Sequence, residues 1–279
     1  MKILVTGANG YIGTGVVKAL LELKQEVIAT DFNINGIDSR AEAIAGNIFE
    51  LENPFEYFGK PDVVLHLAWR NGFVHNSDSH MNDLNKHLDF ITKMAKQGIK
   101  KIVVMGSMHE IGFWEGRIDE KTPCNPLSMY GIAKNTLRQA ASIICNTNNV
   151  PFQWIRGFYI VGNSDKGSSI FSKITLAERE GKKDFPFTTG INQYDFLDYD
   201  IFCEQIANVT INNNHLGIIN CCSGKPESLA SRVERFIKEN NYKIKLNYGV
   251  YPDRPYDSLA VWGDNKIIKE IMEENKAKF

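Results

Sequence analysis

The most constraining feature of the chain is a glycine-spaced turn, Thr6–Gly13, which directly follows a short apolar run at residues 2–5. The run predicts a buried strand, and the apolar residues at 16–21 predict a helix after the turn. Three glycines carry the spacing: Gly7, Gly10 and Gly13. In such a strand–turn–helix unit the first glycine permits the tight turn, and the second lets the backbone approach a phosphate. The third glycine lets the helix pack closely on the strand. The sequence therefore predicts a dinucleotide pyrophosphate site at the N-terminus of the helix.

An acidic residue, Asp31, ends the second apolar run at residues 26–30. A carboxylate at this strand end suits the ribose hydroxyls of adenosine and repels a 2′-phosphate. Phe32 and Asn33 follow, where an arginine would point to a phosphate partner. We therefore predict NAD, rather than NADP, as the cofactor.

Apolar runs and helical patterns alternate along the first half of the chain. Strands are predicted at 62–68, 101–106 and 152–156, and helices at 81–97 and 129–146. Continuous apolar strands between helices of this length indicate a parallel sheet that is covered on both faces. The predicted fold class is α/β, with a doubly wound parallel sheet of the Rossmann type.

The alternation loosens after residue 161. Helices are predicted at 170–181, 199–210 and 226–240, strands at 218–222 and 243–248, and a linker-like stretch at 182–193. We divide the chain into a dinucleotide-binding domain, 1–160, and a smaller substrate-binding part, 161–279. The connections of the smaller part are expected to interleave with the first domain, so it is not an independent domain.

Composition excludes several classes of function. A formal net charge of -1, with 23% charged residues, gives no overall field to attract nucleic acid or an anionic membrane. No apolar run approaches the roughly 18 residues that a membrane helix needs, and no signal pattern precedes the first strand. The five cysteines are odd in number and lack metal-ligand spacing. We expect free thiols, no metal site, and a reducing cytoplasm.

A tyrosine and a lysine, Tyr130 and Lys134, stand four residues apart in the predicted helix 129–146 and so share one helical face. A cation held there stabilises phenolate, which lowers the pKa of the tyrosine toward the working pH. Such a phenol can give or take a proton at an alcohol or ketone carbon. Ser107 follows the strand 101–106, at a carboxyl strand end where ligands gather in doubly wound sheets. We predict these three as the catalytic residues. Ser107 is expected to donate a hydrogen bond to the substrate oxygen that Tyr130 protonates.

Together these segments resemble the extended short-chain dehydrogenase/reductase family, the NAD-dependent epimerase/dehydratase class of nucleotide-sugar enzymes. The resemblance spans nearly the whole chain. It rests on the segments 6–13, Asp31, 62–68, Ser107 with Gly112, Tyr130 with Lys134, 156–158, 195–200 and 254–257.

The resemblance implies the ligand contacts of individual residues. The cofactor contacts that it implies are Gly7, Gly10, Tyr11, Ile12, Gly13, Asp31, Asn47, Ile48, Leu67, Ala68, Trp69, Tyr130, Lys134 and Phe158. Asn47 and Ile48 stand where the family usually has an aspartate and an apolar residue near adenine. For a nucleotide-sugar substrate, it implies contacts from Ser107 and Tyr130, and an Arg254 that binds the diphosphate. Arg70, just after a strand end, either faces the substrate or lies in a plain loop.

Departures from the family pattern narrow the reaction. Dehydratases of this family carry an Asp-Glu pair directly after the catalytic hydroxyl, and here those places are Met108 and His109. Sugar dehydration is therefore not expected. The epimerase-reductase that makes GDP-fucose has a cysteine at the place of His109. Since a histidine can act as an acid or base near neutral pH, His109 either contacts the substrate in that role or is structural.

Within the family, segments 66–70, 106–112 and 156–162 are most similar to enzymes that reduce a 4-keto sugar. This implies reduction of dTDP-4-dehydro-6-deoxy-L-mannose (dTDP-4-dehydro-L-rhamnose) to dTDP-6-deoxy-L-talose by NADH. Two alternatives stay open: a nucleotide-sugar 4-epimerase that recycles a bound NAD, and a non-catalytic NAD sensor with a protein partner. Members of the family are often homodimers, so a homodimer is possible for this chain, and its sequence leaves the oligomeric state open.

Overall fold

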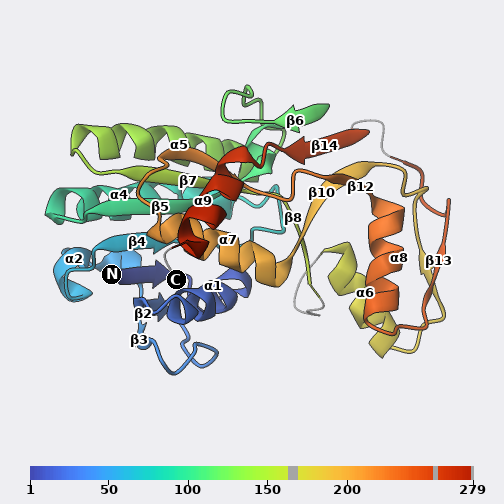
Figure 1. Ribbon diagram of the computed structural model, residues 1–279, viewed down its shortest axis with the longest axis horizontal. Coiled ribbons are helices and arrows are strands. Elements are labelled where there is room, and N and C mark those ends of the chain that lie inside the picture. Colours follow the sequence, from blue (N-terminus) through green and yellow to red (C-terminus); the bar gives the residue numbers. More distant parts are fainter. Residues whose placement is uncertain (163–168, 254–256, 278–279) are drawn as a thin grey trace.

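The computed structural model describes residues 1–162, 169–253 and 257–277 of the chain. Seven parallel strands form the large sheet, in the order β11-β7-β5-β4-β1-β2-β3 (Figure 1). These strands are β1 (Lys2–Thr6), β2 (Glu26–Asp31), β3 (Glu42–Ala45), β4 (Val63–His66), β5 (Lys101–Ser107), β7 (Phe152–Gly157) and β11 (Gly217–Cys221). The strand order reverses between β1 and β4, which is where doubly wound sheets open a crevice for a ligand.

Helices cover both faces of this sheet. One face carries α1 (Tyr11–Glu22), α7 (Tyr199–Ile211) and α9 (Lys266–Lys276). The other carries α2 (Pro54–Tyr57), α4 (Leu84–Gln97) and α5 (Met129–Thr147), with the short α3 (Ser79–Asn82) beside α4 and α5. Because successive strand residues point to opposite faces, Ile3 and Val5 of β1 enter one core and Leu4 the other.

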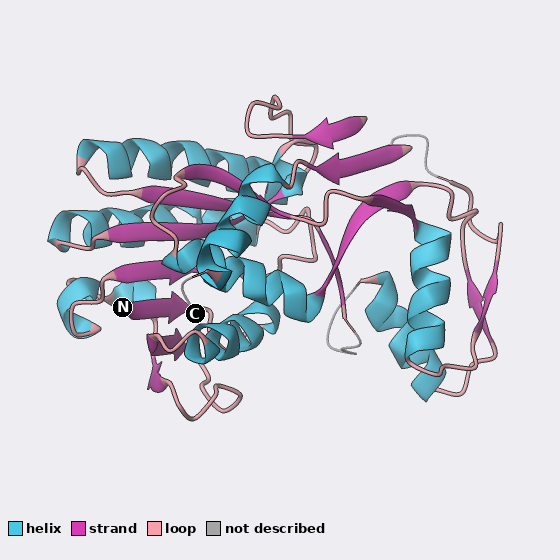
Figure 2. Ribbon diagram, in the orientation of Figure 1, coloured by secondary structure: helices cyan, strands magenta, loops and turns pink. Residues whose placement is uncertain are grey.

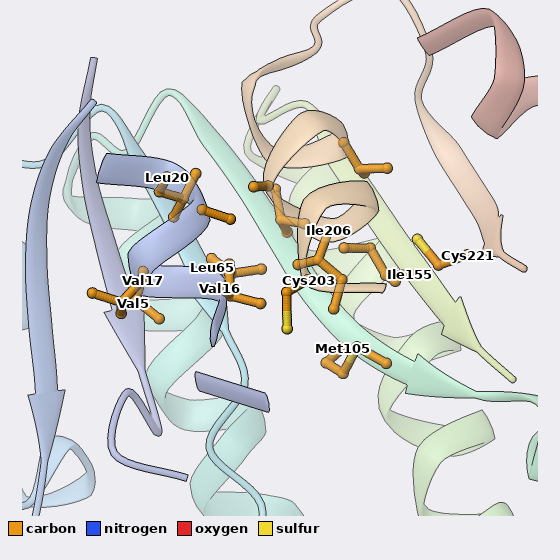
Figure 3. Packing of buried hydrophobic residues seen from close by; sticks show 14 of the residues in the cluster. Val5, Val16, Val17, Leu20, Leu65, Met105, Ile155, Cys203, Ile206 and Cys221 are labelled. Carbon is orange, nitrogen blue, oxygen red and sulfur yellow. The ribbon is translucent and has the colours of Figure 1, made fainter. Parts of the chain in front are cut away.

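The core beneath α1 and α7 joins parts of the chain that are far apart in sequence. In Figure 3, Val5 and Leu65 of the sheet lie near Val16 of α1 and Ile206 of α7. All four side chains are fully buried, and each contributes about 1.5–3 kcal/mol through the removal of apolar surface from water. This packing holds the turn before α1 in a fixed position over the sheet.

The smaller part of the molecule lies beside the large sheet, on the right in Figure 2. Its main sheet has the order β12-β10-β14-β6, with β8 also paired to β10, and a second sheet pairs β13 with β9. The bounds of these strands are β6 (Gly116–Ile118), β8 (Tyr159–Val161), β9 (Asp184–Pro186), β10 (Gln193–Asp198), β12 (Pro226–Ser228), β13 (Lys245–Asn247) and β14 (Ala260–Gly263). Two helices, α6 (Ile170–Arg179) and α8 (Leu229–Glu239), pack here around Phe171, Val233 and Phe236.

The predicted fold class is confirmed, and two predicted segments are wrong. The helix predicted over 226–240 begins only at Leu229, because residues 226–228 pair antiparallel with β10 and Ser228 caps the helix through the N–H of Ser231. The linker-like stretch 182–193 contains β9. β11, α7 and α9, all beyond residue 160, belong to the large sheet and its helices. The division at residue 160 stays a prediction.

Candidate active site

A cavity of about 1570 Å³ lies at the carboxyl ends of the strands of the large sheet. Residues that end or directly follow five of these strands line it: Gly7, Asp31, Leu67, Ser107 and Phe158. The smaller part closes the opposite wall with residues such as Phe171 and Tyr194. This is the position at which the reversal of strand order predicts a ligand.

The cavity brings together most of the site residues predicted from the sequence. Those that line it are Gly7, Gly10, Tyr11, Ile12, Gly13, Asp31, Asn47, Leu67, Ala68, Trp69, Arg70, Ser107, His109, Tyr130, Lys134 and Phe158. Ile48 is not among them, because its side chain is 7% exposed and packs in the core with Leu4 and Ile28. Arg254 lies outside the described residues.

The turn after β1 requires glycine at two of its positions. Gly7 has a φ of +69°, in the left-handed region that favours glycine. A Cβ on Gly7 would lie 2.7 Å from the Cα atom of Ala68. A Cβ on Gly13 would lie 2.2 Å from the carbonyl oxygen of Gly7. A side chain at Gly7 would therefore push the turn away from the backbone that follows β4, and a side chain at Gly13 would push α1 away from the turn.

The N-terminus of α1 fits an anionic group of a cofactor. Its N-cap residue is Gly10, which supplies no capping side chain, and its first turn holds no acidic residue. The N–H groups of this turn and the positive end of the helix dipole thus remain available to a phosphate. The residues present fit the pyrophosphate of a dinucleotide.

Asp31 is held firmly at the end of β2. One of its carboxylate oxygens accepts from the backbone N–H of Asn9 at 3.0 Å, and the other from that of Phe32 at 2.8 Å. The negative charge therefore has a fixed place in the cavity wall. Asn47 caps the short turn after β3, since its side-chain oxygen accepts from the N–H of Phe49 at 3.2 Å.

The three predicted catalytic residues meet on the same side of the cavity. Ser107 is the last residue of β5, and its Oγ accepts from the N–H of His109 at 3.2 Å. Tyr130 and Lys134 come from the first turns of α5. The Lys134 ammonium donates to the carbonyl of Met105 at 2.7 Å and lies 3.9 Å from the centre of a Trp69 ring. Its distance from the centre of the Tyr130 ring is 5.9 Å.

Burial dominates the acid–base properties of this group. Burial raises the pKa of Tyr130 to about 12, although its side-chain hydrogen bond with Ser107 opposes the shift. Burial also lowers the pKa of Lys134 to about 7. The sequence predicted that Lys134 would lower the pKa of Tyr130, and that direction is wrong for this structure. The reason is that both groups are removed from water, and the ammonium bonds to Met105 and stacks on Trp69 instead.

Histidines that sequence reasoning did not assign surround the Tyr130 ring. His75 lies 5.5 Å from it and nearly parallel, and His80 lies at 5.3 Å. Nδ1 of His80 accepts from the Trp69 indole at 3.1 Å, so its Nε2 carries the proton and donates to the carbonyl of Val74 at 2.9 Å. His75 lies in the loop between β4 and α3, and His80 lies in the four-residue α3 itself. Both segments are too short and irregular to leave a periodic signal in the sequence.

A fully buried carboxylate, Glu110, lies beneath the site. Its two oxygens accept from the Trp154 indole and from the Arg156 guanidinium, each at 2.8 Å. The negative charge of Glu110 adds to the upward shift of the Tyr130 pKa and opposes the larger downward shift that burial causes in the Lys134 pKa. The residue thus contributes to the electrostatics of the site without lining the cavity.

Arg70 stands at the mouth of the cavity. Its Nε donates to one oxygen of Asp83, whose other oxygen accepts from Lys86 at 2.8 Å. The Arg70 side chain remains 63% exposed, so a contact with substrate stays a prediction. Within the described ranges, no group of three His, Cys, Asp or Glu side chains is placed to hold a metal ion. Nor is any helix of that part long and apolar enough to cross a membrane.

Comparison with known protein families identifies the family of this chain. Residues 3–221 match the model of the NAD dependent epimerase/dehydratase family. The chain belongs to this family. Membership confirms the predicted class, an NAD-dependent enzyme of the extended short-chain dehydrogenase/reductase type, and NAD as its cofactor.

A relative within the epimerase/dehydratase family matches over nearly its full length. It is the dTDP-6-deoxy-L-talose 4-dehydrogenase (NAD(+)) of Aggregatibacter actinomycetemcomitans. The two sequences are 47% identical over 269 residues, which cover 94% of this chain and 99% of the relative.

Solved structures of family members share the fold. The UDP-N-acetylglucosamine 4-epimerase from Methanobrevibacter ruminantium M1, in complex with UDP-N-acetylmuramic acid, has a TM-score of 0.83 at 19% identity and covers 97% of this chain and 91% of its own. The UDP-glucuronic acid 4-epimerase from Bacillus cereus, in complex with UDP-glucuronic acid and NAD, has a TM-score of 0.81 at 20% identity. The match covers 98% of this chain and 93% of the epimerase chain. At these identities the likeness concerns the fold alone.

Proposed function

We propose that this enzyme reduces dTDP-4-dehydro-6-deoxy-L-mannose, also called dTDP-4-dehydro-L-rhamnose, to dTDP-6-deoxy-L-talose with NADH. The observation that carries the proposal is the 47% identity, over nearly all of both chains, with a dehydrogenase named for this product. The cavity supports it, because the glycine turn, Asp31 and the three polar residues of β5 and α5 all line one continuous space.

The side chains at the cavity wall suit a proton transfer to a sugar oxygen. NADH, when bound, supplies the hydride to C4. Tyr130, with its pKa raised to about 12, keeps its proton at neutral pH and donates it to the C4 oxygen as negative charge develops there. The Ser107 hydroxyl accepts from the N–H of His109 and is hydrogen-bonded to Tyr130, so a sugar oxygen bound by Tyr130 lies within reach of both hydroxyls. The Lys134 ammonium, 5.9 Å from the centre of the Tyr130 ring, donates to the carbonyl of Met105 and so ties this part of α5 to β5, which carries Ser107.

Two neighbouring side chains count against sugar dehydration. Met108 is 6% exposed and packs against Ile111 and Phe158 in an apolar cluster. Neither it nor His109 supplies a carboxyl group after Ser107. The site therefore lacks the acid pair with which dehydratases of the family are expected to remove water.

The decisive experiment incubates the purified protein with dTDP-4-dehydro-L-rhamnose and NADH. We expect one NADH oxidised for each sugar reduced, with 6-deoxy-talose identified by NMR of the product. The Tyr130→Phe variant is the matched control, since it removes only a hydroxyl. It should lose roughly a hundredfold or more in kcat, with NADH affinity largely kept.

The same assay separates the alternatives. Interconversion of 4-epimers without net NADH consumption would indicate an epimerase, and NADH binding without turnover across a panel of nucleotide sugars would indicate a sensor. Full turnover by Tyr130→Phe would contradict the proposed mechanism.

The proposal also includes a homodimer that works in the cytoplasm. The support for the homodimer is a pair of exposed apolar side chains on one side of α5, Ile132 and Ile143, which lie about three turns apart and are 39% and 67% exposed. Light scattering of the purified protein measures the mass directly, and a monomer at micromolar concentration would contradict it.

A further inference from the structure

A pair of imidazoles beside Tyr130 has no role in the mechanism above. The rings of His75 and His109 lie 4.4 Å apart, and both residues line the cavity. The His75 ring is tilted by only 11° from the plane of the Tyr130 ring. His109 follows Ser107 by two residues, and its ring lies 6.0 Å from that of Tyr130. The pair thus adjoins both hydroxyls that act on the reacting oxygen.

The backbone of His75 is fastened to the helix that carries Tyr130. Its carbonyl accepts from the N–H of Tyr130 at 2.8 Å, and the side-chain oxygen of Asn76 accepts from the N–H of Met129 at 3.3 Å. Ser128 accepts from the N–H of Gly131 at 3.1 Å. The first three N–H groups of α5 are therefore all satisfied, two of them by this loop. His75 is held at a fixed place relative to the catalytic hydroxyl.

The ring nitrogens of the pair differ from those of the neighbouring His80. Both nitrogens of His80 are used in hydrogen bonds with Trp69 and Val74. Those of His75 and His109 have no hydrogen-bond partner within the described part of the chain. Polar groups in a pocket that lack protein partners are the ones available to a ligand.

Both rings of the pair are neutral at physiological pH. Burial lowers the pKa of His109 to about 4, and burial beside His80 lowers the pKa of His75. A neutral imidazole offers one N–H donor and one nitrogen acceptor. This matches a hydroxyl, which also donates and accepts, whereas a phosphate or carboxylate is better matched by a cation.

We propose that His75, together with His109, binds a hydroxyl of the sugar ring adjacent to the carbon that is reduced. In the substrate of the proposed function, on which this inference rests, that group is the hydroxyl on C3. Since Tyr130 and Ser107 bind the oxygen on C4, the imidazoles beside them face the next oxygen along the ring. His75 is thus a substrate-binding residue that selects sugars with a free hydroxyl at this position.

The test compares His75→Leu, which keeps the volume but has no polar atom, with His75→Gln, which keeps a donor and an acceptor. We expect His75→Leu to raise the KM for dTDP-4-dehydro-L-rhamnose about tenfold, with the Kd for NADH changed less than about twofold. His75→Gln should recover most of the loss. An analogue without the C3 hydroxyl should lose about tenfold in kcat/KM with the wild type but little with His75→Leu.

The control is Asn76→Ala, which removes one anchor of the loop and leaves the imidazole in place. It should show a smaller rise in KM and keep discrimination against the 3-deoxy analogue. An unchanged KM in His75→Leu, or a parallel loss of NADH affinity, would overturn the inference while leaving the proposed function intact. If the wild type leaves NADH unoxidised with this sugar, the proposed function falls, and this inference with it.

Discussion

Lys134 illustrates at the scale of one residue how a functional group is held at a cost to stability. Its side chain is 3% exposed, and burial lowers its pKa from 10.5 to about 7. Desolvation of an ammonium is unfavourable, and the bond to Met105 and the contact with Trp69 offset it only in part. An apolar residue at this position would fill the same space without that cost.

We predict that Lys134→Met abolishes turnover and stabilises the fold. Between pH 7 and pH 10.5 the unfolded chain binds this proton more tightly than the folded protein, so the residue's contribution to stability rises with pH. At pH 7 the variant should therefore be more stable than the wild type, by about 1–3 kcal/mol. This difference in stability between Lys134→Met and the wild type should shrink toward zero as the pH approaches 10.5.

Urea unfolding of both proteins at the two ends of this pH range measures the effect. Lys121→Met, which replaces an exposed lysine, is the control and should leave the pH dependence of stability unchanged. A Lys134→Met variant that is less stable than the wild type at pH 7 would refute the argument.

At the scale of elements, the first turn of α1 is tied to α7 by one hydroxyl. Tyr199 donates to the carbonyl of Tyr11 and accepts from the N–H of Gly15 at 3.1 Å. These two groups, four residues apart, are the usual partners of an α-helical hydrogen bond, so the hydroxyl lies between them. A Cβ at Gly15 would come within 2.6 Å of it. The helix proposed to hold the pyrophosphate is therefore positioned by a residue from the second half of the chain.

Removing this hydroxyl should weaken cofactor binding. We expect Tyr199→Phe to raise the Kd for NADH several-fold and to cost about 1 kcal/mol in stability, because two backbone groups lose a partner while the ring packing is kept. Fluorescence titration with NADH and urea unfolding measure the two effects. Tyr57→Phe, at a 52% exposed tyrosine, should change neither, and equal NADH affinity in Tyr199→Phe and wild type would contradict the positioning role.

The elements also show what can be read from the sequence. β1, β5 and α5 were predictable because each carries its own apolar pattern over several residues. The three-residue strands β6 and β12 were not, because each exists only through pairing with a distant segment: β6 with β14, and β12 with β10. The site divides in the same way. The spacing of Tyr130 and Lys134 lies within one helix, whereas the place of His75 depends on hydrogen bonds between a loop and the start of α5.

At the scale of the whole molecule, the large sheet is completed by the far end of the chain. β11 supplies an edge strand beside β7, and α7 and α9 cover the face that α1 shares (Figure 1). Phe202 and Ile206 of α7, with Ile268 and Ile271 of α9, are buried against this face. Each of these side chains contributes about 1.5–3 kcal/mol by burial, a large fraction of the net stability of an ordinary domain.

This architecture predicts that residues 1–160 do not fold by themselves, although the sequence pattern suggests a division there. A fragment ending at residue 160 lacks β11, α7 and α9, so the apolar face of β1, β4 and α1 would be exposed to water. We expect the fragment to show no cooperative urea transition and a poorly dispersed amide NMR spectrum, while the full chain unfolds cooperatively in the same buffer. A fragment with a dispersed spectrum and its own cooperative transition would show instead that residue 160 marks an autonomous domain, and that the returning elements only add to a core already formed.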